Sequence, residues 1–268
     1  MNLPESGCTY GFTAITEPGS RYQLEHVASR AEKTETGYVL SGTKSLVIDA
    51  PLADIILVPA RTSGDTQDVD GISLSCVETQ AAGVSLTECR TIDDGYAAGI
   101  QFADVLVPET SLIGEKGEGL RLVKAGVDMA TLAVCAEAVG IMQAVIETTA
   151  EYLQTRQQFG QPLSRFQAMQ HRMADMYVAM KRVESITRVA ALEFNSDDLL
   201  HRQTLLSGAK IRAGRDGRYV GEQGVQLHGG IGVTDESIIS HYLKRLAAID
   251  ALFGNGQFHS GQYGDGSD

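Results

Sequence analysis

The stretch Tyr152–Gln170, YLQTRQQFGQPLSRFQAMQ, is the most informative part of the sequence. It predicts two amphipathic helices joined by a glycine–proline turn, with Arg156 just before the turn. Ser164 and Gln167 have the spacing of a capping box, which would start the second helix. A plain helical hairpin does not need an arginine and Phe-Gly where one helix ends and Phe-Gln where the next begins. The stretch therefore predicts a functional site as well as a fold.

Helical periodicity extends on both sides of this stretch. We expect helices over about 120–158, from 164 onward, over 199–227 and over about 235–253, which together suggest an antiparallel four-helix bundle. The second helix would present one apolar face, formed by Phe166, Met169, Met173, Met176, Tyr177, Met180 and Val183. The tail 261–268 is rich in Gly and Asp, so we expect it to be disordered.

Before residue 115 the apolar residues alternate with a period of two. The segments expected to be strands are 10–15, 37–40, 55–59, 72–77, 84–88 and 99–107. β-branched residues are frequent in them and turn residues separate them, so residues 1–115 are predicted to form an antiparallel β-domain, a sandwich or small barrel. The glycine-rich segment 114–119 predicts a flexible junction before the bundle, which would span 116–260. The expected fold class is α+β.

The composition and charge of the chain restrict the classes of function that it can have. The net charge of −12 on 268 residues argues against general nucleic-acid or membrane-surface binding. The four cysteines have no paired or zinc-type spacing, which predicts reduced thiols in a cytoplasmic protein. The start of the sequence has no signal-peptide pattern. The longest apolar run, 129–145, contains Glu137 and is expected to be a buried helix.

The stretch 152–170 resembles the signature of the acyl-CoA dehydrogenase family, flavoenzymes that oxidise the Cα–Cβ bond of acyl-CoA thioesters. Three more segments are similar to the family and occur in its order: Ala14–Ser20 (AITEPGS), Gly37–Asp49 (GYVLSGTKSLVID) and Gln226–Gly232 (QLHGGIG). The resemblance covers about residues 8–259. It implies FAD as the cofactor, an acyl-CoA as the substrate, and a homo- or hetero-oligomer.

The resemblance also implies the cofactor contacts: Thr16 with the flavin ring, and Arg156, Phe159, Gln226, Gly229 and Gly230 with the dinucleotide end across a subunit boundary. A guanidinium can bind phosphate oxygens through two parallel hydrogen bonds, and glycines let the backbone approach closely. Taken alone, these glycines would be a helix stop and Arg156 a solvated arginine. His228 is expected to be a satisfied histidine without a cofactor role.

Several positions depart from the family pattern. The aromatic residue and threonine that usually contact the flavin align with Leu46 and Ile48. In the family a glutamate removes the α-proton while the β-hydride goes to the flavin. Its usual position aligns with Phe253 or Gly254, and the position used by other members aligns with Ala130. Neither position carries a carboxylate in this chain.

Glu137 is the remaining candidate for the catalytic base. It lies in an apolar helix, on the face of Ala130 and about 10 Å further along the axis. A carboxyl group in apolar surroundings has a raised pKa, as a base that works near neutrality needs. The alternative is a glutamate that points away from the apolar stripe or pairs with a basic residue of a neighbouring helix.

Two segments, Cys135–Gly140 and Phe253–His259, look like the small-subunit type of two-gene dehydrogenases, such as the pimeloyl-CoA and steroid side-chain enzymes. In these enzymes two unlike subunits share flavin sites. The sequence begins almost directly at the β-domain, without the helical domain that family members carry first. By this resemblance the chain is either a truncated form or one whose partner covers the exposed pocket surface.

Two hypotheses for the function result. The first is an FAD-dependent acyl-CoA dehydrogenase or a subunit of one, for which an electron-transfer flavoprotein is a possible electron acceptor. The second is a non-catalytic structural subunit of a heteromeric acyl-CoA dehydrogenase. A di-iron bundle is excluded because its Glu-x-x-His motif does not occur in the sequence, and no metal site is expected.

Overall fold

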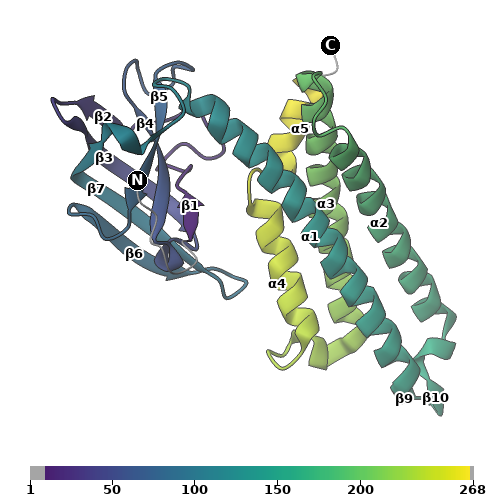
Figure 1. Ribbon diagram of the computed structural model, residues 1–268. Coiled ribbons are helices and arrows are strands. Elements are labelled where there is room, and N and C mark those ends of the chain that lie inside the picture. The colour runs from purple at the N-terminus through teal and green to yellow at the C-terminus, as the bar shows by residue number, and fades with distance from the viewer. Residues whose placement is uncertain (1–9, 266–268) are drawn as a thin grey trace. The chain divides into compact units, whose positions relative to one another are not determined.

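The computed structural model describes residues 10–265 and divides into two compact units, 1–127 and 128–268 (Figure 1). The first unit is mainly β-sheet and the second is helical, which confirms the expected α+β class. The boundary between the units falls inside the first long helix. The expected boundary, between residues 115 and 116, lies twelve residues earlier in the chain than the one between 127 and 128.

The first unit contains an eight-stranded sheet in the order β6-β7-β3-β2-β4-β5-β8, with β1 paired to β4. The strands are β1 (Gly11–Thr13), β2 (Arg30–Lys33), β3 (Gly37–Ile48), β4 (Ile55–Arg61), β5 (Ile72–Glu78), β6 (Val84–Arg90), β7 (Tyr96–Pro108) and β8 (Leu112–Ile113). Neighbours are antiparallel except for the β1–β4 and β2–β4 pairs. Two 3-10 turns, η1 (Ala50–Leu52) and η2 (Glu109–Ser111), follow β3 and β7.

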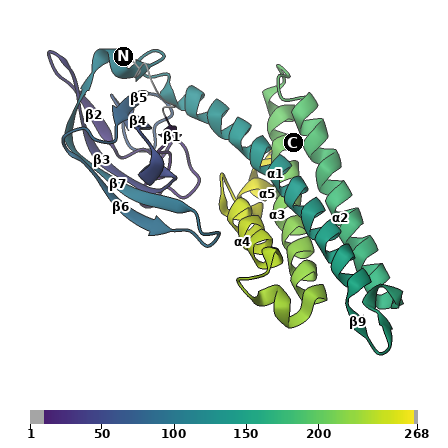
Figure 2. The same ribbon diagram turned by 60° about the horizontal axis from the view of Figure 1, so that its bottom comes forward.

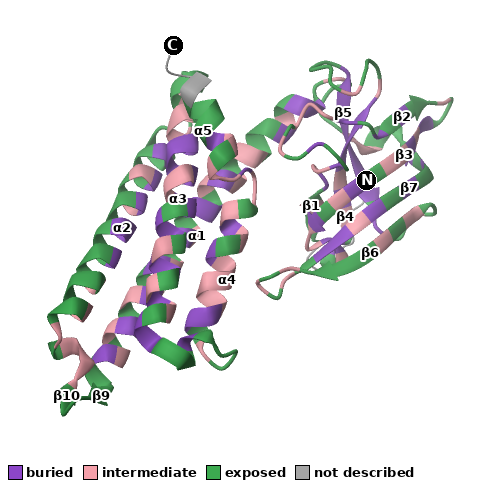
Figure 3. Ribbon diagram, turned by 180° about the vertical axis from the view of Figure 1, so that it is seen from behind, coloured by how far each residue is buried: buried purple, intermediate pink, exposed green. Residues whose placement is uncertain are grey.

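Burial differs from strand to strand in this unit (Figure 3). Strand β5 is buried along almost its whole length, whereas the edge strand β6 is largely exposed. Strand β3 is longer than expected because its pairing with β7 continues past two irregularities, one of them between Lys44 and Val47. Within this bulge Leu46 has a positive φ of 49° and its side chain is 60% exposed.

A buried ion pair fixes the loop that follows β1. Lys44 Nζ lies 2.7 Å from Glu17 Oε1, and both side chains are almost fully buried. Lys44 also donates to the Pro59 carbonyl, and the backbone N–H groups of Ala28 and Ser29 donate to the Glu17 carboxylate. Burial alone would raise the pKa of Glu17, but the Lys44 charge and these hydrogen bonds hold it below its usual range.

The second unit is a bundle in which α1 to α4 lie side by side (Figures 1 and 2). The helices are α1 (Gly119–Thr155), α2 (Gln167–Leu192), α3 (Leu199–His228), α4 (Ile238–Ala251) and α5 (Gly256–Asp265), with short 3-10 segments η3 (Leu163–Arg165) and η4 (Gly229–Val233). Helix α3 contacts α2, α4 and α5. The expected four-helix bundle is therefore present, with α5 added where a disordered tail was expected from residue 261. The expected tail residues 266–268 lie outside the described residues.

The turn between the first two helices differs from the expected one. Helix α1 ends at Thr155, and a small hairpin follows, with strands β9 (Gln157–Gln158) and β10 (Gln161–Pro162). The two residues at its tip, Phe159 and Gly160, have positive φ angles of 55° and 78°. Positive φ at both central residues is characteristic of a type I′ turn, which suits a two-residue hairpin loop.

Two expectations about α2 were wrong. Its N-cap is Phe166 without a side-chain cap bond, because Ser164 belongs to η3 and lies two residues before the N-cap, where it cannot form the capping box. Tyr177 is 51% exposed instead of lining the apolar face. The other residues of that face are buried or partly buried, and Met176, Met180 and Val183 belong to the bundle core.

The segment before α1 is held in place instead of forming the expected flexible junction. The Gly117 N–H donates to Ser73 Oγ at 2.9 Å, and Glu118 forms a β-bridge with Ile72. A Cβ at Gly119 would lie 2.7 Å from the Leu74 nitrogen, so glycine is needed at this close approach.

Helix α1 is, among the described residues, the one helix long and apolar enough to cross a membrane by length and composition alone. A core helix of a bundle has the same composition. Its Cys135, Ala138, Met142 and Val145 are fully buried in the bundle core, which is consistent with the expected buried helix.

Replacing Lys44 by Met tests the buried ion pair. The Glu17 carboxylate would then be buried without its cation, and we expect the free energy of unfolding to fall by about 3–5 kcal/mol. Urea unfolding at pH 7 measures this change. The control is Lys33→Met, which removes an exposed ion pair with Glu109 and should leave the stability nearly unchanged. Equal stability of the two variants would contradict the role given to Lys44.

Candidate functional site

Five predicted site residues lie at one end of the bundle and are called the helix-end cluster: Arg156, Phe159, Gln226, Gly229 and Gly230. An aromatic contact joins the two chain segments that carry them. The ring of Tyr152, one helical turn before Arg156, stacks on the ring of His228 with centroids 4.4 Å apart. Because His228 directly precedes Gly229, the structure brings Arg156 and the glycines to the same end of the bundle.

The helix-end cluster is open to a ligand. The Arg156 side chain is exposed and forms no hydrogen bond or ion pair with the described residues. A Cβ on Gly229 or Gly230 would meet no atom within 4 Å, so the backbone there can be approached closely. Phe159 is 90% exposed and touches the Phe166 ring edge to face. A free guanidinium is a suitable partner for a phosphate group.

Three other residues form the strand-end cluster in the first unit: Thr16, Leu46 and Ile48. The Thr16 carbonyl accepts a hydrogen bond from the Ser45 N–H at 2.8 Å, which holds the threonine beside the β3 bulge. The half-buried Thr16 hydroxyl has no hydrogen-bond partner among the described residues. Leu46 and Ile48 add apolar surface but no aromatic face and no further hydroxyl. Thr16 is therefore the one side chain of this cluster that can donate a hydrogen bond.

Glu137 has a cationic partner. Arg245, on α4, donates to both of its carboxylate oxygens, from Nε at 2.6 Å and from a terminal nitrogen at 2.9 Å. Both side chains are roughly one third exposed. The predicted apolar surroundings are therefore wrong, and the alternative, a basic partner on a neighbouring helix, is confirmed. The sequence could not reveal this partner because it lies 108 residues away.

The loop after α4, where a family glutamate would align, contains no acidic side chain at Phe253 or Gly254. Both residues have positive φ, 55° and 108°. Buried Lys210 holds the loop from α3, because its Nζ donates to the carbonyls of Asp250 and Gly254 at 2.9 and 2.6 Å. Burial lowers the pKa of this lysine. In the sequence, Lys210 is a cation among small and apolar residues such as Gly208, Ala209 and Ala213, and this pattern indicates a buried lysine.

His259 is the second buried group at this loop. Its ring nitrogens lie 3.2 Å from Ser207 Oγ and 3.1 Å from the Phe253 carbonyl. Burial, with a smaller effect of the Lys210 charge, lowers the pKa of His259 to about 4. The histidine is therefore neutral at physiological pH and contributes to the structure of the loop.

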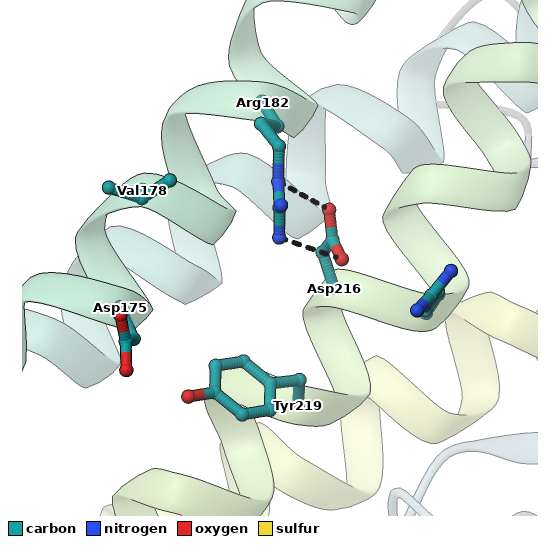
Figure 4. Close-up of a pocket in the computed structure, with 6 residues that line it drawn as sticks. Asp175, Val178, Arg182, Asp216 and Tyr219 are labelled. Atoms are coloured by element: carbon teal, nitrogen blue, oxygen red, sulfur yellow. Dashed lines mark hydrogen bonds and ion pairs between the residues drawn. The ribbon is translucent and has the colours of Figure 1, made fainter. Parts of the chain in front are cut away.

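A pocket of about 290 Å³ lies between α2 and α3 (Figure 4) and contains none of the predicted site residues. Its lining residues are Asp175, Val178, Arg182, Arg215, Asp216 and Tyr219. Arg182 is paired with the buried carboxylate of Asp216, with Nε 3.3 Å from Oδ2. The Arg182 guanidinium that lines the pocket is thus already neutralised.

The described residues provide no group of three or more acidic, histidine or cysteine side chains that could hold a metal ion. Cys76 and Cys135 are buried free thiols and Cys89 is an exposed one. Cys8 lies outside the described residues. His228 is a satisfied histidine, as expected, because its Nδ1 lies 2.8 Å from the Gly224 carbonyl.

Comparison with known proteins gives matches over both units. Residues 13–105 match the middle domain of acyl-CoA dehydrogenase, and residues 117–266 match the C-terminal domain. A mitochondrial short-chain specific acyl-CoA dehydrogenase from Sus scrofa is 31% identical over 92% of this chain. A mitochondrial 2-methylacyl-CoA dehydrogenase from Solanum tuberosum is 29% identical over 94%. The chain spans about 60% of the length of these relatives.

Solved structures agree with this result. Butyryl-CoA dehydrogenase from Megasphaera elsdenii superposes with a TM-score of 0.88 at 25% identity, over 95% of this chain and 67% of the other. The likeness therefore includes both the β-sheet unit and the bundle.

The low pKa of His259 predicts a pH dependence. The unfolded chain binds a proton at His259 below about pH 6.5, whereas the folded chain does so only below about pH 4. Stability is therefore lost as the pH falls between these values, by roughly 3 kcal/mol at most. Urea unfolding at pH 7 and pH 4.5 should show a smaller loss in His259→Gln than in the wild type. His171→Gln, at an exposed histidine on α2, is the control. Identical losses in all three proteins would contradict the assignment.

Proposed function

Because the chain belongs to the acyl-CoA dehydrogenase family, we propose that it binds FAD and forms an acyl-CoA dehydrogenase or one subunit of such an enzyme. The reaction is the α,β-dehydrogenation of an acyl-CoA thioester. The observation that carries this proposal is the helix-end cluster, in which the free Arg156 guanidinium lies at the same bundle end as the open Gly229–Gly230 backbone.

The residues of the helix-end cluster fit the dinucleotide end of FAD. Arg156 would bind the diphosphate through its guanidinium. Gly229 and Gly230 would let the adenosine part approach the main chain, and exposed Gln226 supplies an amide for polar contacts. Phe159 offers an exposed aromatic face. When bound, FAD supplies the hydride acceptor for the oxidation of the substrate.

The strand-end cluster fits the flavin ring less fully. Thr16 can donate one hydrogen bond to it, and Leu46 can exclude water from one side. Leu46 stands where the family pattern has an aromatic residue, and Ile48 stands where it has a threonine hydroxyl. We therefore propose that this cluster makes fewer contacts with the ring than the dinucleotide end makes with the rest of the cofactor.

A second candidate function is a non-catalytic subunit that keeps the cofactor contacts. Two observations favour it. No carboxylate stands at Phe253, Gly254 or Ala130, and both oxygens of Glu137 are engaged by Arg245. In that case a second acyl-CoA dehydrogenase subunit supplies the base. In either case an electron-transfer flavoprotein is a suitable electron acceptor.

Glycine replacement tests the cofactor assignment. In Gly230→Ala the new methyl group stands in the open space at the helix end, where FAD would approach the main chain. We therefore expect the Kd for FAD to rise at least tenfold. Fluorescence titration of the full chain with FAD measures it. The control is Gly140→Ala, an exposed and equally open glycine inside α1. It should stabilise the helix by about 0.5–1 kcal/mol and leave the affinity unchanged. Unchanged affinity in Gly230→Ala would contradict this use of the backbone.

Glu137→Gln separates the two candidate functions. The purified chain, alone and together with a second dehydrogenase subunit, is mixed with an acyl-CoA, and bleaching of the visible flavin absorbance is recorded. Because Arg245 engages Glu137, we expect bleaching to require the second subunit and to persist in Glu137→Gln. Bleaching by the chain alone that is lost in this variant, with FAD still bound, would make Glu137 the base and this chain a complete catalyst.

A further inference from the structure

The contact between Tyr152 and His228 joins the two chain segments of the helix-end cluster. The sequence around neither residue indicates this role. The rings are stacked, with centroids 4.4 Å apart and an angle of 24° between their planes. The Tyr152 hydroxyl also donates to the His228 carbonyl at 3.4 Å. The two residues are 76 positions apart and belong to different helices, α1 and α3. Neither residue is among the cofactor contacts assigned above.

Each residue of this pair is directly linked to one half of the helix-end cluster. The Tyr152 carbonyl accepts the N–H of Arg156 at 2.9 Å, so the tyrosine belongs to the turn that ends in the arginine. His228 is followed immediately by Gly229, where the chain leaves α3 with a φ of 63°. The stack is therefore the contact between the arginine turn and the glycine terminus.

The surroundings restrict how either ring can move. His228 is buried, and its Nδ1 lies 2.8 Å from the Gly224 carbonyl one turn earlier in α3, which fixes the imidazole plane. Tyr152 is partly buried and packs against the bundle core. A ring held by a stacked partner and by its surroundings positions its neighbours better than an exposed side chain does, because fewer rotamers remain available to it.

We infer that Tyr152 and His228 are positioning residues, which set the separation between the Arg156 guanidinium and the Gly229–Gly230 backbone for the diphosphate of the dinucleotide. The inference rests on the proposed function, since it concerns affinity for FAD. A bidentate guanidinium contact depends strongly on geometry. Loss of the stack therefore weakens FAD binding even though the residues that touch FAD are unchanged.

The test measures the Kd for FAD of the full chain, in the assembly that co-purifies with it, for wild type and variants. Tyr152→Leu removes the stack and should raise the Kd at least tenfold. Tyr152→Phe keeps the stacked ring and should stay within about threefold of wild type. His228→Asn removes the other ring but keeps a donor for the Gly224 carbonyl, and should resemble Tyr152→Leu. It also provides a second measurement if Tyr152→Leu does not fold.

Two controls distinguish positioning from general destabilisation. Tyr219→Leu removes a partly buried tyrosine ring that packs against the bundle core, on α3 about two turns before Gln226, and should leave the Kd unchanged. In a double-mutant cycle, Tyr152→Leu should add little to the loss caused by Arg156→Met, because the tyrosine acts through the arginine.

The outcomes separate the inference from the proposed function. If wild type and Tyr219→Leu bind FAD and Tyr152→Leu binds it equally well, the positioning role is wrong and the proposed function stands. Additive losses in the double-mutant cycle also overturn the positioning role. If wild type binds no FAD even with a second dehydrogenase subunit, the proposed function fails and the inference fails with it.

Discussion

The shape of the strand-end cluster depends on the buried ion pair between Glu17 and Lys44. Taking two charges out of water costs several kcal/mol per ion, and removing one partner leaves the other uncompensated. Here the Glu17 carboxylate also accepts hydrogen bonds from two backbone N–H groups, and the Lys44 ammonium donates one to a carbonyl. Little hydrogen-bonding capacity is therefore left unused. The pair joins the loop after β1 to β3, next to the bulge. The positions of Thr16 and Leu46 relative to each other therefore follow from an interaction that involves neither of them.

Periodicity predicted the long elements and missed most of the short ones. The expected strands and the last two expected helices lie where β1, β3 to β7, α3 and α4 are found, although β1 and β6 are largely exposed. Strand β2 was missed because three of its four residues are exposed, and β8 has only two residues. The hairpin at Phe159 was missed because glycine and proline signal a turn without specifying its kind. Phenylalanine is also an unusual residue at a positive φ, so its type gave no indication of the turn.

The candidate site was predictable where its residues lie close in sequence, and its supporting contacts were not. The helix-end cluster follows from two motifs, and one aromatic contact brings them together. By contrast, the partner of Glu137 lies on α4, and the buried Lys210 holds a loop some forty residues further along the chain. Such pairings depend on tertiary packing, which a single sequence does not encode in any local pattern. They also bear on the chemistry, since Arg245 makes the candidate base Glu137 a member of an ion pair.

The position of Arg156 at a helix terminus has a consequence for dynamics. Helix ends open locally at a much lower free-energy cost than a whole domain. When the last turn of α1 frays, the Arg156 guanidinium moves away from the Gly229–Gly230 backbone while the rest of the bundle stays folded. At the proposed dinucleotide site, this local opening would release the cofactor on warming before global unfolding does. Amide hydrogen exchange near Thr155 would reveal the opening, and a bound dinucleotide would slow it.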